Sequence, residues 1–256
     1  MARLLAHTIT GIRRDRVCFL IHPMGAEKSF WQAFETQLRD EACTVAADQY
    51  GAGVTADITE PLSLDGHVRD IETLRQHLGI DRMVVIGCAI GAMIGARYSE
   101  LYPQHVSALV MTNPGLRTRQ PARQALMLRA QTVRSGGMDA VIPAATDAAF
   151  FGCPEDGRKA AYVEQFCLQN PTNYAATIES ILDLDLTETY RHIHCPVLLV
   201  PGGHDKLFTS DHADEIKALI PQAELELLPH GAHFIPYQTP EDLGDKVLAF
   251  LARHRL

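Results

Sequence analysis

Short apolar runs alternate along the chain with longer stretches in which apolar residues recur at helical spacing. The apolar runs lie at Val17 to Ile21, Cys43 to Ala47, Met83 to Ile86, Val106 to Met111, Pro196 to Val200 and Glu224 to Leu228. Several of them stop at glycine, proline or asparagine, which is typical of a buried strand followed by a loop. These runs therefore predict the strands of a buried sheet.

The stretches between these runs predict helices. Val68, Ile71, Leu74 and Leu78 lie three or four residues apart, and Gly79 stands where a helix commonly ends. Further helices are expected over Gly91 to Leu101, Asp211 to Leu219 and Pro240 to His254. Strands that alternate with helices indicate an α/β fold, with a mostly parallel sheet and helices on both faces.

This alternation is interrupted in the second half of the chain. From Arg117 to Tyr190 there is no convincing buried strand, and helical stretches are broken by glycines and prolines. We expect one domain, in which residues 1–116 and 191–256 form the core and residues 117–190 form an inserted helical cap. No internal repeat and no low-complexity linker is present.

Composition and charge narrow the class of protein. The chain has 256 residues, 46% hydrophobic and 21% charged, which is enough for one sizeable core. Its longest apolar run, Met83 to Ala96, is too short to span a membrane, and Met1 to Arg16 lacks the apolar region of a secretory signal. A net charge of -8 disfavours nucleic acid as a partner. We expect a cytoplasmic protein that acts on a small molecule without membrane contact; the oligomeric state stays open.

No metal or cofactor is expected from the sequence. The six cysteines show no C-x-x-C spacing and are typical of small buried residues in a reducing compartment. His192 and His194 flank Ile193 just before a predicted strand, but they lack a third ligand.

One loop at the carboxyl end of a predicted strand has a recognisable pattern. Ligands of open parallel sheets bind at this edge. The segment from Gly87 to Gly91 has the frame of the G-x-S-x-G nucleophile elbow, a strained turn that presents its central side chain to a pocket. Here the centre is Ala89 instead of serine. The glycines could also serve only close packing of a helix.

Taken with this elbow, further motifs resemble those of the α/β-hydrolase superfamily, particularly the 3-oxoadipate enol-lactonase-like and C–C-bond hydrolase branch. His22 to Gly25 resembles its oxyanion loop, and Asp48 to Gly53 resembles its D-x-R-G-x-G turn, with Tyr50 in place of the arginine. Gly202 to Asp205 is similar to the loop that supplies the acid, and Gly231 to Phe234 is similar to the histidine segment. The resemblance covers nearly the whole chain, and the order of elbow, acid and histidine is that of this fold.

The resemblance implies a role for each of these residues. His233 would transfer protons, Asp205 would fix its tautomer, and the backbone N–H groups of Met24 and Ile90 would stabilise an oxyanion. Asp205 could instead only cap its turn, and His233 could be structural, with His230 in its place.

Four arginines at the start of the cap are candidates for binding a substrate carboxylate: Arg117, Arg119, Arg123 and Arg129. The alternative is a solvated helix face.

An alanine methyl group cannot attack a carbonyl carbon, so Ala89 leaves several interpretations open. Alanine could have been substituted for a nucleophilic serine. It could also be the natural residue, as the resemblance to an aminoacrylate hydrolase-like group of pyrimidine catabolism implies, with His233 and Asp205 acting as a general base. Other possibilities are Cys88 as a substitute nucleophile, a lyase or other cofactor-free reaction, or ligand binding without turnover.

From the resemblance we predict a hydrolase that needs no cofactor. Its expected substrate is small, polar and carboxylate-bearing, with a lactone, ester, amide or 1,3-dicarbonyl-type bond.

Overall fold

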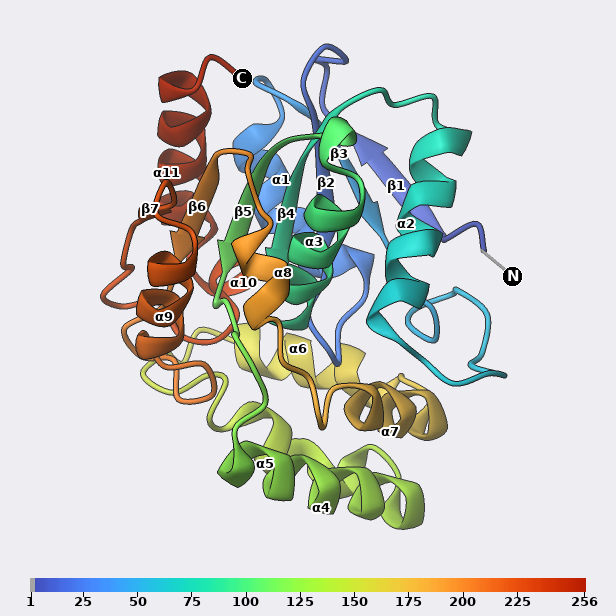
Figure 1. The fold of residues 1–256 in the computed structure, drawn as a ribbon. Coiled ribbons are helices and arrows are strands. Elements are labelled where there is room, and N and C mark those ends of the chain that lie inside the picture. The colour runs from blue at the N-terminus through green and yellow to red at the C-terminus, as the bar shows by residue number, and fades with distance from the viewer. Residues whose placement is uncertain (1–2) are drawn as a thin grey trace.

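The computed structural model describes residues 3–256 and contains one sheet flanked by helices (Figure 1). Its strands are β1 (His7–Thr10), β2 (Val17–Ile21), β3 (Cys43–Ala47), β4 (Met83–Cys88), β5 (Val106–Thr112), β6 (Val197–Val200) and β7 (Glu224–Leu225). They are ordered β1-β3-β2-β4-β5-β6-β7. Only the pairing of β1 with β3 is antiparallel among the strands of the described residues. The predicted fold class is confirmed.

Helices follow most of the strands. They are α1 (Gln32–Leu38), α2 (Leu64–His77), α3 (Ile90–Leu101), α4 (Gln120–Gly136), α5 (Ile142–Thr146), α6 (Arg158–Cys167), α7 (Pro171–Ser180), α8 (Thr187–Arg191), α9 (Asp211–Leu219), α10 (Ile235–Gln238) and α11 (Pro240–Arg253). Within residues 3–256, no helix combines the length and the apolar character that crossing a membrane requires.

The alternation of side chains along the strands divides the core between the two faces of the sheet. On β2, Cys18 and Leu20 belong to the core on the side of α1 and α11, whereas Phe19 and Ile21 belong to the core on the side of α2 and α3. All four side chains are buried, because helices cover both faces.

The segment between β5 and β6 contributes helices α4 to α8. Figure 1 shows α4 to α7 grouped at one end of the sheet, the end that the loops after the parallel strands face. Where this segment leaves and rejoins the core, Arg117 and Asp185 form an isolated bridge. We call residues 117–190 the cap. Its bounds stay a prediction, and residues 1 and 2 of the predicted core lie outside the described residues.

Several elements differ from those predicted. The strand β1 was not expected, because three of its four residues are exposed and it has no apolar run. The short helix α1 was not expected either. The strand predicted over Glu224 to Leu228 pairs along only two residues, and Leu228 returns to the sheet as an isolated bridge to Gly202. An edge strand has one neighbour, so its pairing is easily interrupted there.

The turn between β4 and α3 depends on glycine at two places. A Cβ atom on Gly91 would lie 2.1 Å from the carbonyl oxygen of Ile21, and one on Gly87 would lie 2.2 Å from the carbonyl oxygen of Gly91. Helix α3 therefore begins in direct contact with the backbone of β2, and this contact fixes the position of the turn at Ala89 relative to the loop after β2.

We expect Gly91→Ala to lower the free energy of unfolding by about 3 kcal/mol, because backbone atoms must move apart to admit the methyl group. The matched control is Gly66→Ala in α2, where the nearest contact is 3.2 Å, to the side-chain oxygen of Ser63; we expect a change below about 1 kcal/mol there. Urea unfolding followed by the fluorescence of Trp31, the single tryptophan, measures both. Equal stabilities of the two variants would contradict this reading of the turn.

Candidate active site

Ala89 lies at the apex of the turn between β4 and α3, with φ 52° and ψ -115°. A positive φ is strained for a residue with a side chain, and such strain is often found at functional sites. The N–H of Ala89 donates to the carbonyl of Thr112 on β5, at 3.0 Å. Ala89 lines a pocket between the core and the cap, so the turn presents its methyl group to that pocket.

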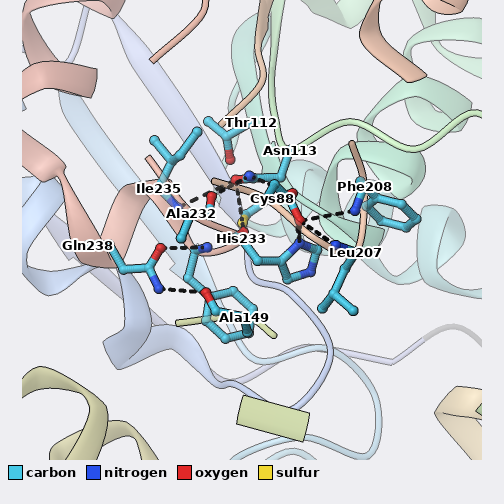
Figure 2. Close-up of polar contacts among 12 residues, drawn as sticks. Cys88, Thr112, Asn113, Ala149, Leu207, Phe208, Ala232, His233, Ile235 and Gln238 are labelled. Atoms are coloured by element: carbon cyan, nitrogen blue, oxygen red, sulfur yellow. Dashed lines mark hydrogen bonds and ion pairs between the residues drawn. The ribbon is translucent and has the colours of Figure 1, made fainter. Parts of the chain in front are cut away.

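Cys88 precedes the apex, and its side chain is directed into the core. Its Sγ lies 3.7 Å from the carbonyl oxygen of His233 and 3.9 Å from Oδ1 of Asn113 (Figure 2). Burial raises the pKa of the Cys88 thiol far above its usual value. The thiol is therefore protonated and sequestered, and these properties are unsuited to a nucleophile.

His233 and Asp205 form a buried pair beside this turn. Nδ1 of His233 lies 2.9 Å from Oδ2 and 3.1 Å from Oδ1 of Asp205. Asp205 belongs to the loop after β6, and His233 immediately precedes α10, so the two meet only through the fold. His233 lines the same pocket as Ala89. With Nδ1 against the carboxylate, Nε2 is the nitrogen left for exchanging a proton with a ligand.

Asp205 is held by donors from its own turn and from β5. It accepts the N–H groups of Leu207 at 2.8 Å and Phe208 at 3.0 Å, and the side-chain amide of Asn113 at 2.9 Å. Burial by itself raises the pKa of Asp205, but the interaction with His233 and the hydrogen bonds from Leu207 and Phe208 outweigh burial and bring the pKa below its usual value. The carboxylate is therefore anionic at neutral pH.

Asn113 is a residue of the site that the sequence did not identify. It adopts φ 50° at the end of β5, and its Nδ2 also donates to the carbonyl of Ala232 at 2.7 Å. It thus joins the loop of Asp205 to the loop of His233. The available signal was an asparagine directly after a predicted strand, a residue that tolerates positive φ.

The two proposed oxyanion donors, Met24 and Ile90, both line the pocket. Ile90 is the first residue of α3, so its N–H has no acceptor within the helix. The Met24 loop is held by His22, whose Nε2 accepts the N–H of Gln49 at 3.0 Å while Nδ1 donates to the carbonyl of Pro23 at 2.8 Å. Burial lowers the pKa of His22, which is consistent with a neutral ring in this role.

A side chain of the core also ties the histidine loop to the cap. Gln238 accepts the N–H of Phe234 at 3.0 Å. Its side-chain amide donates to the carbonyl of Ala149 at 2.9 Å (Figure 2). The N–H of His233 donates to the same carbonyl, at 3.2 Å. The cap therefore helps to fix the histidine as well as covering it.

The pocket is small and mostly apolar. Its volume is about 130 Å³. The core contributes Ala89, Ile90 and His233 to its walls, and the cap contributes Tyr162 and Tyr174 among other residues. Such a volume suits a ligand of few atoms.

The structure separates the four candidate arginines. Three of them form ion pairs and do not line the pocket: Arg117 with Glu215, Arg119 with Asp211 and Glu215, and Arg123 with Asp183. They pair with carboxylates of α9 and of the loop before α8, and their expected role in substrate binding stays a prediction. Arg129 does line the pocket. It lies six residues after Arg123 on α4, roughly 240° around the helix axis.

The sequence left His230 open as an alternative to His233, and it gave His192 and His194 as a metal pair without a third ligand. The ring of His230 lies against His204, with centroids 5.9 Å apart, and it is His233 that contacts Asp205. Among residues 3–256 no group of three or more His, Cys, Asp or Glu side chains is arranged to hold a metal ion.

Comparison with known proteins extends these observations. Residues 17–240 match the family model described as "alpha/beta hydrolase fold". The chain is 27% identical over 253 residues, 93% of each chain, to the Escherichia coli O81 (strain ED1a) protein named "Putative carbamate hydrolase RutD". A thermophilic esterase from Thermogutta terrifontis, solved with malate bound, is similar in structure with a TM-score of 0.89 and 20% identity, covering 98% of this chain and 94% of the esterase.

The enol-lactonase from Burkholderia xenovorans LB400 is also similar in structure, with a TM-score of 0.89 and 22% identity, covering 97% of this chain and 96% of the enol-lactonase. At these identities the two solved structures share the fold with this chain, and the fold alone does not specify a substrate.

The lowered pKa of Asp205 predicts a contribution to acid stability. A carboxyl whose pKa is lower in the folded than in the unfolded chain stabilises the fold above its unfolded pKa of about 3.9, and this contribution is lost as the pH falls through the folded pKa. We expect Asp205→Asn to lose stability mainly at neutral pH, so that its deficit shrinks between about pH 5 and pH 2. Urea unfolding at a series of pH values measures this deficit.

The control is Asp245→Asn, at an exposed position on α11. A deficit of Asp205→Asn that stays constant across the pH range would contradict the assignment of the charge.

Proposed function

The chain belongs to the alpha/beta hydrolase fold family and is a hydrolase, and from this premise we propose that it activates a water molecule directly, through His233 and Asp205. The observation that carries the proposal is that a histidine paired with a carboxylate faces the pocket, whereas the turn beside it offers no nucleophilic side chain. His233, Met24 and Ile90 line the pocket and Asp205 contacts His233, while the apex residue is alanine and the neighbouring thiol of Cys88 is buried in the core. A base without a nucleophile is suited to deprotonating water.

The reaction would follow from this arrangement. Water attacks the substrate carbonyl carbon as Nε2 of His233 takes one of its protons, and Asp205 stabilises the imidazolium that forms. The N–H groups of Met24 and Ile90 donate to the oxyanion. When the tetrahedral intermediate collapses, the bond to the leaving group breaks and His233 returns the proton to that group, which restores the neutral histidine.

The missing nucleophile also limits the substrate. General-base catalysis typically contributes 10²- to 10⁴-fold to a rate, so the scissile bond must already be reactive. A lactone, an activated ester, a carbamate or a 1,3-dicarbonyl compound meets this condition better than a simple amide. The name of the relative described as a putative carbamate hydrolase supports a carbamate as the first substrate to assay.

We expect His233→Ala to lower kcat for an activated ester such as p-nitrophenyl acetate by about 10²- to 10⁴-fold, because the base is removed. Asp205→Asn is expected to lower kcat as well, since it can no longer stabilise the imidazolium. His230→Ala is the matched control, because this ring lies against His204 instead of Asp205. Unchanged rates in the first two variants would overturn the proposal and leave ligand binding without turnover.

The choice between water and a covalent nucleophile has its own test. A fluorophosphonate probe should not label the unaltered chain, since Ala89 offers no hydroxyl, and should label Ala89→Ser, whose hydroxyl would lie at the apex of the turn. Intact-protein mass spectrometry measures the adduct. Labelling of the unaltered chain would reveal a nucleophile elsewhere and would contradict direct attack by water.

A further inference from the structure

Tyr162 of the cap forms a hydrogen bond with the loop of Met24, residues 22–25. Its hydroxyl oxygen lies 3.0 Å from the carbonyl oxygen of Gly25, and both residues are buried. Burial raises the pKa of Tyr162 well above its usual value, so the hydroxyl keeps its proton and donates to this carbonyl. Within the described part of the chain, no other group donates to the carbonyl of Gly25. The cap therefore holds the loop at this point.

Glycine at position 25 lets helix α6 approach the loop closely. Gly25 adopts φ 78°, and a Cβ atom there would lie 3.0 Å from the ring of Phe166 and 3.1 Å from the hydroxyl of Tyr162. The backbone of the loop therefore packs directly against two side chains of α6. On the core side, Nδ1 of His22 donates to the carbonyl of Pro23 at 2.8 Å. The residues before and after the proposed oxyanion donor are thus held from opposite sides.

The ring of Tyr162 packs against the segment that carries the base. Its centroid lies 4.9 Å from that of Phe234, the residue that follows His233. It also lies 5.4 Å from the ring of Phe150, which is next to the cap carbonyl that accepts the N–H of His233. One side chain therefore contacts the histidine segment through its ring and the loop of Met24 through its hydroxyl.

We infer that Tyr162 is a positioning residue, which holds the N–H of Met24 in place relative to His233. This inference rests on the proposed function, because the two groups are the oxyanion donor and the base proposed there. An oxyanion donor is effective only when it points to where the charge develops, so a rotation of the loop that turns the N–H away weakens it. Loss of the hydroxyl would leave the buried carbonyl of Gly25 unpaired and would favour such a rotation.

A role in the pocket wall alone explains less, because a phenylalanine ring would line the pocket as well. Tyr237 offers a direct comparison. Its hydroxyl donates to the carbonyl of Arg158 on α6 at 3.1 Å, and its ring lies 6.0 Å from that of Tyr162. Tyr237 is not among the described residues that line the pocket. The two tyrosines differ in which carbonyl they hold, so Tyr237→Phe is the matched control for Tyr162→Phe.

The position of the loop can be measured without turnover. We compare the backbone order parameters of the Met24 and Gly25 amides by NMR relaxation in the unaltered chain and in the two variants. In Tyr162→Phe we expect them to fall from about 0.85, typical of rigid backbone, toward about 0.6, while Tyr237→Phe leaves them unchanged. Unchanged values in Tyr162→Phe, or an equal fall in Tyr237→Phe, would overturn the inference.

The kinetic effect should fall on kcat. We expect Tyr162→Phe to lower kcat for p-nitrophenyl acetate about tenfold and to change KM less than about twofold, because the donor acts on the transition state. Outright removal of an oxyanion donor typically costs 10²- to 10³-fold, and a misplaced donor costs less. Tyr237→Phe should keep the kcat and KM of the unaltered chain. Equal kcat values in the two variants would contradict the role of Tyr162.

A sulfur analogue of the substrate separates this role from a general loss of structure. In p-nitrophenyl thionoacetate sulfur replaces the carbonyl oxygen, and sulfur is a weak hydrogen-bond acceptor. The unaltered chain should therefore hydrolyse the oxygen ester faster than the sulfur analogue, and Tyr162→Phe should reduce this preference several-fold. A variant that loses the same factor with both esters would overturn the inference, since disordered packing lowers both rates alike.

Failure of this inference is distinguishable from failure of the proposed function. If the unaltered chain hydrolyses neither ester, the proposed reaction is contradicted, and the order parameters still decide whether Tyr162 holds the loop. If hydrolysis depends on His233 but Tyr162→Phe changes neither the order parameters nor kcat, only the role of Tyr162 is contradicted.

Discussion

The buried carboxylate of Asp205 is the feature on which the rest of the site depends. An ionised side chain can remain inside a protein only when donors replace the water it has lost. Here the donors come from its own turn, from Asn113 at the end of β5 and from His233 before α10. Hydrogen bonds to the Asp205 carboxylate therefore hold three loops together. The same contacts fix the position and the tautomer of His233.

The turn at Ala89 is placed by a second constraint, the contact between backbone atoms at the start of α3. Because Gly91 lies against the carbonyl of Ile21, the turn after β4 and the loop after β2 are fixed relative to each other, and Met24 and Ile90 reach the same pocket. The two constraints arise independently, one electrostatic and one steric. Together they place His233, Met24 and Ile90 around one pocket, and the cap adds Arg129 to its walls.

Much of this arrangement was predictable because the chain carries strong local signals. Buried parallel strands are read as apolar runs, and β3 and α9 have the bounds that the sequence predicts, Cys43 to Ala47 and Asp211 to Leu219. An apolar run does not predict a strand reliably where the strand is mostly exposed, as in β1, or where it pairs over only two residues, as in β7. Asn113 was missed for another reason, since a single polar residue after a strand has many uses and only its contacts show which one applies.

The sequence by itself determined the alternation of strands and helices, the order of the elbow, acid and histidine segments, and the absence of a hydroxyl or thiol at position 89, since each is a property of neighbouring residues. Only the tertiary structure decided which arginine faces the pocket. Arg117, Arg119, Arg123 and Arg129 are equivalent as sequence, because the acidic side chains that pair with three of them lie far away along the chain. Folding pairs Arg117 and Arg119, which precede α4, with side chains of α9. It pairs Arg123 on α4 with Asp183 and leaves Arg129 on the wall of the pocket.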